Sequence, residues 1–469
     1  MNIANNVVNF KDFERNVRDA INQIGCQFIK NQLENWDIIL MNERNKERLR
    51  HRGRDKTSIK TLMGEVDFLR VRYDIMESGT KTGSVYLLDE AIGLVGSGHF
   101  SELMSELIVQ ASCVGSYRNA SREVSEMTGQ SISHTAAWNM IQAIGKQVDR
   151  QELHSARLAT KNKGSGTIET PVLHEEQDGI WLKLQGKDRK KFGKSKEMKL
   201  AIAYDGAKKT GKNRYELTNK VACAGIETPE KFFKRKEGMI AATFDVDTID
   251  MRFLGGDGAH WIKRSKTDET VHYQLDTYHR NRAITTYVSD EIARKTIRQL
   301  LYTNDVDFLL TVIQAYLDST EDEDEKANYQ QLLTYFTKNK DGLVPIHQRG
   351  LNIPELPEGK VYRRLGAMES NVFSIANRMK GKRAAWSIKG ANNLARLLCL
   401  NITGRLSETL ENMGSCIIPE RYSEEIPVKI SAATIPEDVG SGYNGFRQTL
   451  IPSNLKWFKD IASIKPIYS

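Results

Sequence analysis

Long apolar runs are missing from this sequence. Its 469 residues are 39% hydrophobic with a mean hydropathy of −0.50, and no window approaches the roughly 18 consecutive apolar residues that a membrane span requires. The first residues, MNIANNVVNFKDFERNV, have neither the basic start nor the apolar stretch of a secretory signal. We therefore exclude a membrane protein, and we expect the chain to stay in the cytoplasm and to form two to four domains.

The cysteines and histidines also do not occur in the spacings that commonly bind metals. The cysteines are odd in number, far apart and never in CxxC spacing, at Cys26, Cys113, Cys223, Cys399 and Cys416. This argues against a disulfide framework and a zinc finger, and predicts reduced, buried thiols. None of the nine histidines occurs in HExxH or HxH spacing, which excludes the common zinc hydrolases.

Positive charge is present in modest excess and comes in blocks. The chain has 68 Lys and Arg against 60 Asp and Glu, a net charge of +8. Residues 41–73 hold ten basic and five acidic residues, residues 183–199 hold eight and two, and residues 370–396 hold six and none. Separated basic blocks are typical of a protein that holds a polyanion at several places, although any single block can be plain solvated surface.

The front of the chain is predicted to be mainly helical. Residues 10–50 repeat apolar side chains at three and four spacing without proline, which predicts a helix. Residues 52–74 partly alternate around Gly64, which predicts a small β-hairpin. Residues 101–156 contain no proline and predict a helical bundle, and the linker KNKGSGTIETP places a domain boundary near residue 165.

Within that bundle the pattern is typical of a helix-turn-helix. A helix is predicted from Tyr117 to Met127, a turn from Thr128 to Gln130, and a second helix from about Ile132 to Gly145, capped by Ser131 or Ser133. The expected shared core is Ala120, Val124, Ile132, Ala137 and Ile141. The expected exposed face presents His134, Asn139 and Gln142, which suit the major groove of DNA. An ordinary αα-hairpin remains the alternative.

After the linker, short β-type runs end in glycine, a helix is predicted over 231–244, and another strand follows. Strands, then a helix, then a strand ending in an acidic residue is the order expected of a ribonuclease H-like α/β core. Asp178 belongs to the first run, and Asp257 follows the last strand between glycines, which allow close approach. Glu369 opens a later basic helix.

Three carboxylates from three elements suit magnesium or manganese, which prefer hard oxygen ligands. Trp181 and Trp261 lie three and four residues beyond the two aspartates. The helix behind Glu369 could grip the DNA backbone through its basic side chains, at Arg378, Lys380, Lys382 and Arg383.

Several strings closely resemble one bacterial family over nearly the whole chain. They include VLHEEQDGIWLKLQGKDRKK, GGDGAHWIK, QLDTYHRNRAI, NKDGLVPIHQRGL and GAMESNVFSIANRMKGKRAAWSIKGANNLARLL. The chain resembles the ISLre-type insertion-sequence transposases, a family formerly called uncharacterised, of the DDE superfamily. The resemblance implies a DDE transposase in which Asp178, Asp257 and Glu369 bind magnesium or manganese, acting on double-stranded DNA at the nucleoid as a homo-oligomer.

The resemblance also implies a motif after the second aspartate, which Asp276 and His279 match. His279 would then be catalytic and Asp276 would support it; a histidine that only ties the strand to the next helix is the alternative. Asp257 and Glu369 are 112 residues apart (369 − 257), which an inserted helical domain explains. No departure from the family pattern occurs at the three acidic positions.

We accordingly expect a ribonuclease H-like α/β catalytic core with an all-α insertion, preceded by a mainly helical DNA-binding region with a small β-hairpin. The expected segments are an N-terminal helix and basic hairpin region (1–100), a helix-turn-helix region with linker (101–165), the first part of the core (166–282), the helical insertion (283–345), the last part of the core (346–415) and a tail (416–469). A DNA-binding regulator, or a nuclease or resolvase on the same core, are the alternative functions.

Overall fold

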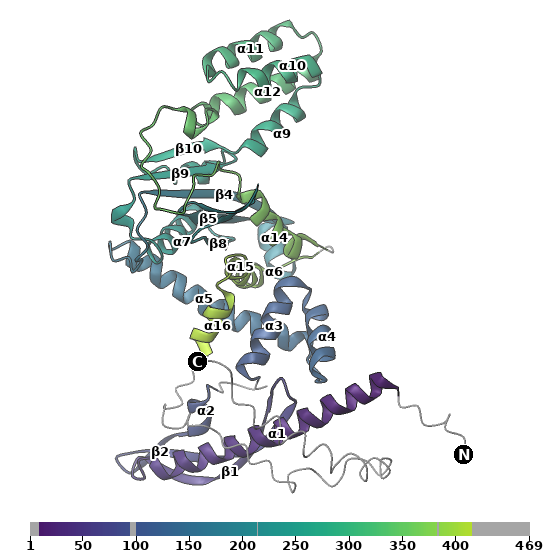
Figure 1. Ribbon diagram of the computed structural model, residues 1–469, viewed down its shortest axis with the longest axis vertical. Helices are drawn as coiled ribbons and strands as arrows, with labels where there is room; N and C mark the ends of the chain where they lie inside the picture. The colour runs from purple at the N-terminus through teal and green to yellow at the C-terminus, as the bar shows by residue number, and fades with distance from the viewer. Residues whose placement is uncertain (1–8, 94–99, 213, 382–383, 415–469) are drawn as a thin grey trace, which may run out of the picture. The chain divides into compact units, whose positions relative to one another are not determined.

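The computed structural model describes residues 9–93, 100–212, 214–381 and 384–414 (Figure 1). The described residues belong to two compact units, one within residues 1–99 and the other within residues 100–415. The predicted tail, residues 416–469, lies outside the described residues. None of the described helices is long and apolar enough to cross a lipid bilayer.

The first unit packs one long helix against a three-stranded sheet in the order β1-β2-β3. The predicted hairpin is confirmed, since β1 and β2 pair antiparallel on either side of a turn that contains Gly64 at φ 152°. The helix predicted to residue 50 ends at Glu43, because Asn45 closes a turn by accepting hydrogen bonds from two backbone N–H groups ahead of β1. The elements are α1 (Phe10–Glu43), β1 (Leu49–Lys60), β2 (Glu65–Glu77), β3 (Thr80–Val85) and α2 (Leu87–Ala91).

The second unit begins with three helices, α3 (Glu102–Val114), α4 (Tyr117–Thr128) and α5 (His134–Ala159). The two predicted helices and the turn between them are present: α4 ends at Gly129, whose φ of 70° favours glycine, and the Ser133 side chain caps α5 by accepting the Ala136 N–H at 3.0 Å. The expected core positions are all buried, at Ala120, Val124, Ile132, Ala137 and Ile141. The second helix is longer than predicted, because its C-terminal half packs against α7 and α15.

A five-stranded mixed sheet follows, in the spatial order β10-β9-β4-β5-β8. The first three strands along the chain, β4, β5 and β8, form an antiparallel meander, and β9 and β10 then add in parallel on the other side of β4. The strands are β4 (Val172–Lys183), β5 (Ser195–Tyr204), β8 (Val221–Gly225), β9 (Met251–Gly256) and β10 (Val271–Leu275), and a separate two-stranded ribbon consists of β6 (Ala207–Gly211) and β7 (Arg214–Leu217).

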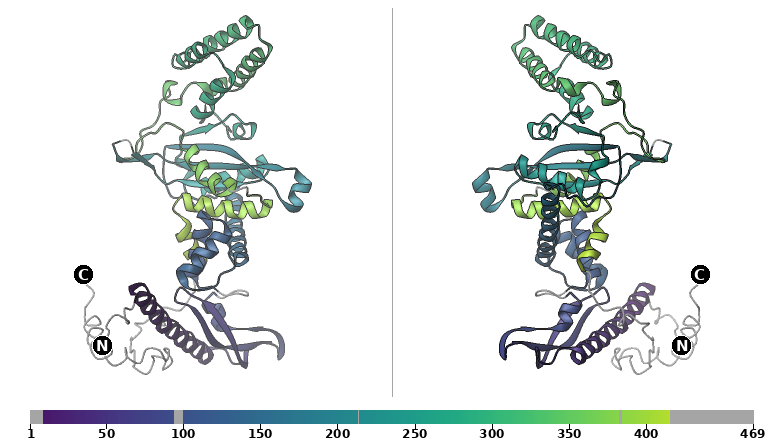
Figure 2. Two further views of the ribbon diagram at one scale, coloured as in Figure 1. Left: turned by 90° about the vertical axis from the view of Figure 1, so that its right-hand side faces the viewer. Right: turned by 90° about the vertical axis from the view of Figure 1, so that its left-hand side faces the viewer.

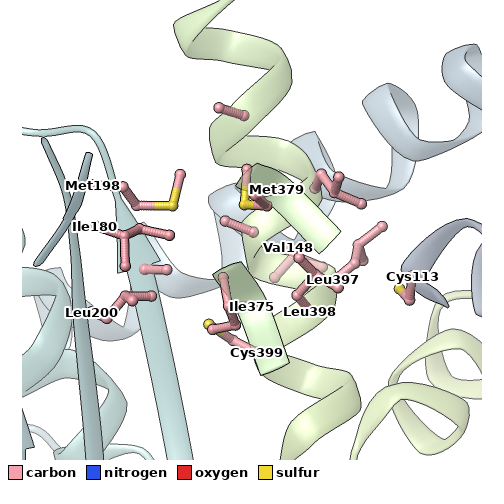
Figure 3. Packing of buried hydrophobic residues seen from close by; sticks show 14 of the residues in the cluster. Cys113, Val148, Ile180, Met198, Leu200, Ile375, Met379, Leu397, Leu398 and Cys399 are labelled. Carbon is pink, nitrogen blue, oxygen red and sulfur yellow. The ribbon is translucent and has the colours of Figure 1, made fainter. Parts of the chain in front are cut away.

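The two faces of this sheet carry different helices. Alternate residues of β4 and β5, such as Ile180, Met198 and Leu200, pack on α14 and α15 (Figure 3). Residues of opposite parity, such as Leu173 and Ala203, pack on α7. Because side chains alternate across a strand, the residues on the even-numbered side of β4 face α14. The helices are α6 (Gly186–Phe192), α7 (Pro229–Ala241), α8 (His260–Lys263), α14 (Met368–Lys380), α15 (Ile388–Ile402) and α16 (Leu406–Gly414).

The helices expected as an insertion lie beyond the β10 edge of the sheet in all three views (Figures 1 and 2). They share one core with β10, in which Tyr273 and Leu275 meet Ile297, Ile313 and Phe336. The helices are α9 (Thr277–Tyr287), α10 (Glu291–Leu300), α11 (Val306–Ser319), α12 (Glu323–Lys338) and α13 (Lys340–Leu343). Two short 3₁₀ turns lie outside this group, at Val246–Thr248 before β9 and at Ile346–Gln348 after α13.

The linker expected near residue 165 does not separate two compact units. α5 precedes the linker, yet it packs closely on both α7 and α15. A Cβ on Gly238 of α7 would lie 2.5 Å from Ala156 backbone atoms, and one on Gly145 would lie 2.6 Å from Asn393. The glycines therefore let the helices approach closely, and residues 101–165 belong to the same unit as the sheet.

The cysteines follow the expectation within the described residues. Cys26, Cys113, Cys223 and Cys399 are free thiols, of which the last three are buried and Cys26 is partly buried. Cys416 lies outside the described residues.

Candidate active site

Strand register brings the first two predicted carboxylates together. β4 and β9 run parallel, and Gln177 of β4 is paired with Gly256 of β9. Asp178 and Asp257 are the next residues on the two strands, so they lie side by side where β9 ends. The backbone N–H of Gly179 donates to the Asp178 carboxylate at 2.7 Å, and the N–H of Ala259 donates to Asp257 at 2.8 Å.

Glu369 reaches the same place because a buried carboxylate holds the start of its helix. Glu176, on the α14 side of β4, accepts hydrogen bonds from the backbone N–H groups of Gly366, Ala367 and Met368 at 2.8, 3.1 and 2.9 Å. The Tyr204 hydroxyl donates a fourth at 2.7 Å. A negative group at a helix N-terminus accepts hydrogen bonds from the free N–H groups and interacts favourably with the positive end of the helix dipole. Glu176 thus fixes the first turn of α14, which carries Glu369.

His279 and Asp276 complete the cluster from β10 and α9. Asp276 follows β10, and its N–H donates to the Gly256 carbonyl at 2.8 Å, directly before Asp257. Its carboxylate caps α9 by accepting the His279 N–H and also lies 3.0 Å from the His279 ring Nδ1. The hydrogen bond to Asp276 raises the pKa of His279. Although burial opposes it, the contact with His279 lowers the pKa of Asp276, so the pair favours an imidazolium beside a carboxylate.

These side chains surround a recess of about 10 Å³, which is room for one water-sized species. Its lining includes Asp178, Asp276, His279 and Glu369 together with Gly255 and Gly256 of β9. Burial raises the pKa of Asp178 to about 6, and the negative charges of Asp257 and Glu369 act in the same direction. The recess therefore concentrates negative charge that water does not fully solvate.

A bound divalent cation would neutralise the excess negative charge at the recess. In the part of the chain that the structure describes, no three His, Cys, Asp or Glu side chains are already gathered closely enough to hold a metal ion. Asp178 and Asp257 instead each accept a hydrogen bond from a nearby backbone N–H. The donor chemistry is nevertheless suitable, because carboxylate oxygens are the ligands that magnesium and manganese prefer. Asp178, Asp257 and Glu369 are the residues that would hold such an ion.

The charge on Asp178 should destabilise the fold at neutral pH. Its pKa is about 6 in the folded chain against 3.8 for an ordinary Asp, so the destabilisation is fully present above pH 6 and disappears as the pH falls towards 3.8. Asp178→Asn should therefore raise the melting temperature at pH 7.5 by about 2 °C, corresponding to about 1 kcal/mol after solvent screening. The gain should vanish at pH 4.

Differential scanning fluorimetry measures this, with and without magnesium. Magnesium should raise the melting temperature of the wild-type protein at pH 7.5 and leave that of Asp178→Asn unchanged, because the variant has lost one of the carboxylates. An Asp178→Asn protein that melts lower than wild type at pH 7.5 would show that the ionised carboxylate stabilises the fold, contrary to this prediction.

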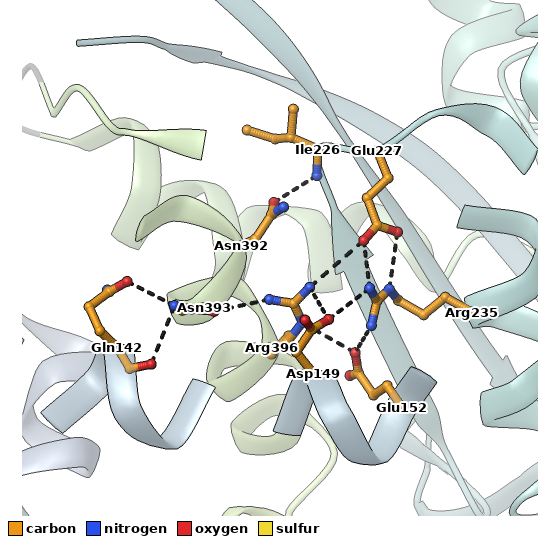
Figure 4. A network of polar contacts seen from close by, with 9 residues as sticks. All are labelled: Gln142, Asp149, Glu152, Ile226, Glu227, Arg235, Asn392, Asn393 and Arg396. Atoms are coloured by element: carbon orange, nitrogen blue, oxygen red, sulfur yellow. Dashed lines mark hydrogen bonds and ion pairs between the residues drawn. The ribbon is translucent and has the colours of Figure 1, made fainter. Parts of the chain in front are cut away.

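The residues predicted to contact DNA from α5 do not share one surface. His134 and Asn139 are exposed as expected. The prediction that Gln142 is on that face is wrong: its side-chain oxygen accepts a hydrogen bond from Asn393 of α15 at 2.8 Å, and its amide nitrogen is buried (Figure 4). α15 covers this side of α5, a contact between residues 251 positions apart, so local periodicity could not reveal it.

The basic residues after Glu369 also differ in their exposure to solvent. Arg378 was expected to grip DNA, but it is turned inward: its Nε donates to the Ser112 carbonyl at 2.7 Å, and its guanidinium lies 5.2 Å from the Tyr117 ring centre and 5.4 Å from that of Trp386. Burial lowers its pKa. It therefore ties α14 to the helical bundle. Lys380 is exposed, and Lys382 and Arg383 lie outside the described residues.

The role of Glu176 in holding the start of α14 is the part of this site that the sequence argument did not assign. The signal was present, because the strand VLHEEQDGIWLK has apolar residues near both ends and places two adjacent acids, Glu175 and Glu176, between them. Acidic side chains are almost never fully buried unless they are paired. Glu176 binds the start of α14, whereas Glu175 on the opposite face forms buried ion pairs with Lys236 and Arg252.

Comparison with known proteins assigns the chain to a family. The model of "Uncharacterised protein family (UPF0236)" matches residues 3–413, and the chain belongs to this family. It is 26% identical over 84% of its length to a UPF0236 protein in the vanSb 3′ region of Streptococcus gallolyticus, covering 85% of that protein. It is also 23% identical over 92% of its length to a UPF0236 protein of Caldanaerobacter subterraneus subsp. tengcongensis, covering 88% of it.

Proposed function

We propose that this protein is a DDE transposase of a bacterial insertion sequence, which binds the ends of its element and catalyses metal-dependent DNA strand cleavage and transfer. The observation that carries the proposal is that Asp178 and Glu369 line one recess, although 191 residues (369 − 178) separate them, and that Asp257 lies near enough for its negative charge to raise the pKa of Asp178. Magnesium or manganese would be the cofactor and double-stranded DNA the substrate. A homo-oligomer in the active complex stays a prediction.

The arrangement of the sheet supports a ribonuclease H-like core. An antiparallel meander of three strands, a helix and two parallel strands follow one another, and acidic residues stand in the first strand and directly after the fourth. The helices α9 to α13 fall between Asp257 and Glu369, where the all-α insertion was expected. The exposed His134 and Asn139 on α5 suit the reading of base edges.

The name of one relative supports the proposal of a mobile DNA element. A UPF0236 protein of Caldanaerobacter subterraneus subsp. tengcongensis, 22% identical to this chain, has a name that joins eleven numbered designations with one prefix. A name of this form suits one protein encoded at several places in a genome, which is what an element that copies itself produces.

The chain's own residues would divide the chemistry between them. A divalent cation, when bound, supplies activation of the attacking hydroxyl or water and stabilisation of the leaving oxygen. Asp178, Asp257 and Glu369 provide the negative charge that holds it, and Glu176 keeps Glu369 in place. His279, whose protonated form is favoured by its contact with Asp276, can donate a hydrogen bond from Nε2 to the scissile phosphate or its leaving oxygen.

A cleavage and joining assay tests the proposal. The DNA substrate would carry the short inverted repeats expected just outside the reading frame, with magnesium or manganese and a plasmid target. The proposal expects nicking at the repeat ends followed by joining to the target. Cleavage without joining would indicate the nuclease or resolvase function instead. Specific binding without cleavage in either metal would indicate a regulator and overturn the transposase proposal.

A further inference from the structure

A basic groove in the second unit shares no lining residue with the recess. It has a volume of about 690 Å³ and lies between α5, α7 and α15. Two of these helices, α7 and α15, contact β8, the edge strand opposite to β10, whereas the recess lies at β4 and β9. The groove is lined by six exposed cations, which are Lys146, Arg157, Lys161, Lys231, Lys234 and Lys389.

The acidic residues of the groove already form ion pairs with two buried arginines. Arg235 and Arg396 are both buried, and each forms ion pairs with the same three carboxylates, Asp149, Glu152 and Glu227 (Figure 4). Among the described residues, none of the six exposed cations makes an ion pair. The floor of the groove is thus a network that holds the three helices together. Its three carboxylates exceed its two guanidinium groups by one charge, so most of the positive charge of the six exposed cations remains uncompensated.

The cations on α5 lie along one side of that helix. Asn139, Lys146 and Arg157 are spaced by 7 and 11 residues, which are about two and three turns of 3.6 residues, so their side chains share a face. At a rise of about 1.5 Å per residue this face extends about 27 Å, the length of about eight base-pair steps of DNA. The exposed Asn139 at one end and the groove at the other therefore lie on a continuous line.

We propose that this groove binds the phosphate backbone of double-stranded DNA as a second DNA contact, separate from the recess. Uncompensated cations on three elements are suited to a polyanion, because each phosphate that they neutralise releases counterions. Among the described residues, no aromatic side chain lines the groove, and single strands are usually held by bases stacked on aromatic rings. A duplex backbone therefore fits better than a single strand. The choice of DNA rests on the proposed function, whereas the groove itself does not.

The test is the salt dependence of binding to a 30-base-pair duplex of unrelated sequence, measured by fluorescence anisotropy with the full-length protein. K146Q/R157Q/K234Q should reduce the slope of log affinity against log salt by about 3, because each lost phosphate contact removes about 0.9. K231Q/K389Q, which changes only α7 and α15, should reduce it by about 2. The control K295Q/R298Q/K338Q, with the same residue types on the helical insertion, should leave it unchanged.

The possible outcomes separate the groove from the catalytic proposal. A wild-type slope in both groove variants, with unchanged melting temperatures, overturns the groove. Equal or larger losses for single-stranded DNA or inorganic polyphosphate overturn the assignment to a duplex. A groove-dependent slope in a protein that neither cleaves nor joins element ends would retain the groove and reject the transposase. Cleavage of element ends by a protein whose groove variants bind DNA normally would retain the transposase and reject the groove.

Discussion

Asp178→Asn, Asp257→Asn and Glu369→Gln should each abolish strand cleavage and joining while leaving DNA binding intact. An amide keeps the shape of a carboxyl group and removes the negative charge that holds a divalent ion. The loss of metal-assisted charge stabilisation amounts to several kcal/mol, which is a rate decrease of about 10³-fold or more. Single-turnover cleavage of element ends measures the rate, and a gel-shift titration measures binding.

Asp324→Asn is a suitable control, because this carboxylate is exposed at the start of α12 in the helical insertion. It should cleave like wild type. Near-normal cleavage by any one of the three amide variants would remove that residue from the site. Lost binding together with lost cleavage would instead indicate that the variant disturbs the fold, which the melting temperature would reveal.

The carboxylates that form the recess were predictable from their local sequence and the family resemblance. Asp257 follows a strand and is flanked by glycines, and Gly255 and Gly256 line the recess. A Cβ on Gly256 would lie 2.8 Å from Ile262, so this glycine is also required for the close packing of β9 on α8. The pattern therefore marked a crowded strand end, although it did not distinguish packing from ligand access.

The position of Glu369 depends on a contact that no local pattern contains. The hydrogen bond from Gly366, just before α14, to Glu176 joins residues that are 190 positions apart in the sequence. Burial raises the pKa of the Glu176 carboxyl, while four hydrogen bonds oppose that effect. Sequence alone could indicate that a buried acid needs partners, but the partners are backbone N–H groups, which carry no residue identity.

The wrong predictions have a related cause. Gln142 and Arg378 were placed on outer surfaces because polar and basic side chains usually are. Both helices instead have neighbours on two sides: α15 covers α5 at Gln142, and the bundle covers α14 at Arg378. A polar residue that binds a buried carbonyl or amide resembles a surface residue in sequence. The expected helices were therefore correct in their core faces, and the errors fell on their remaining sides.

His279→Ala should lower the rate of the chemical step by about 10² to 10⁴, the usual contribution of a general acid or base. Its Nδ1 lies 3.0 Å from Asp276, and among the described residues no hydrogen bond to its Nε2 is formed, so this atom is available to a substrate. His279→Asn, which keeps a hydrogen-bond donor, should recover part of the loss. His154→Ala, at an exposed histidine of α5, should not change the rate.

The pH profile separates chemistry from a structural role for this pair. Asp276 raises the pKa of His279, so the imidazolium persists to higher pH than in an ordinary histidine. Asp276→Asn removes that support and should move the alkaline limb of the single-turnover cleavage rate to lower pH, whereas a histidine that only ties β10 to α9 would leave the limb in place. Full cleavage by His279→Ala with a lowered melting temperature would assign the pair to stability, because its contribution to folding is present below the ordinary histidine pKa and is lost as the pH rises through the raised one.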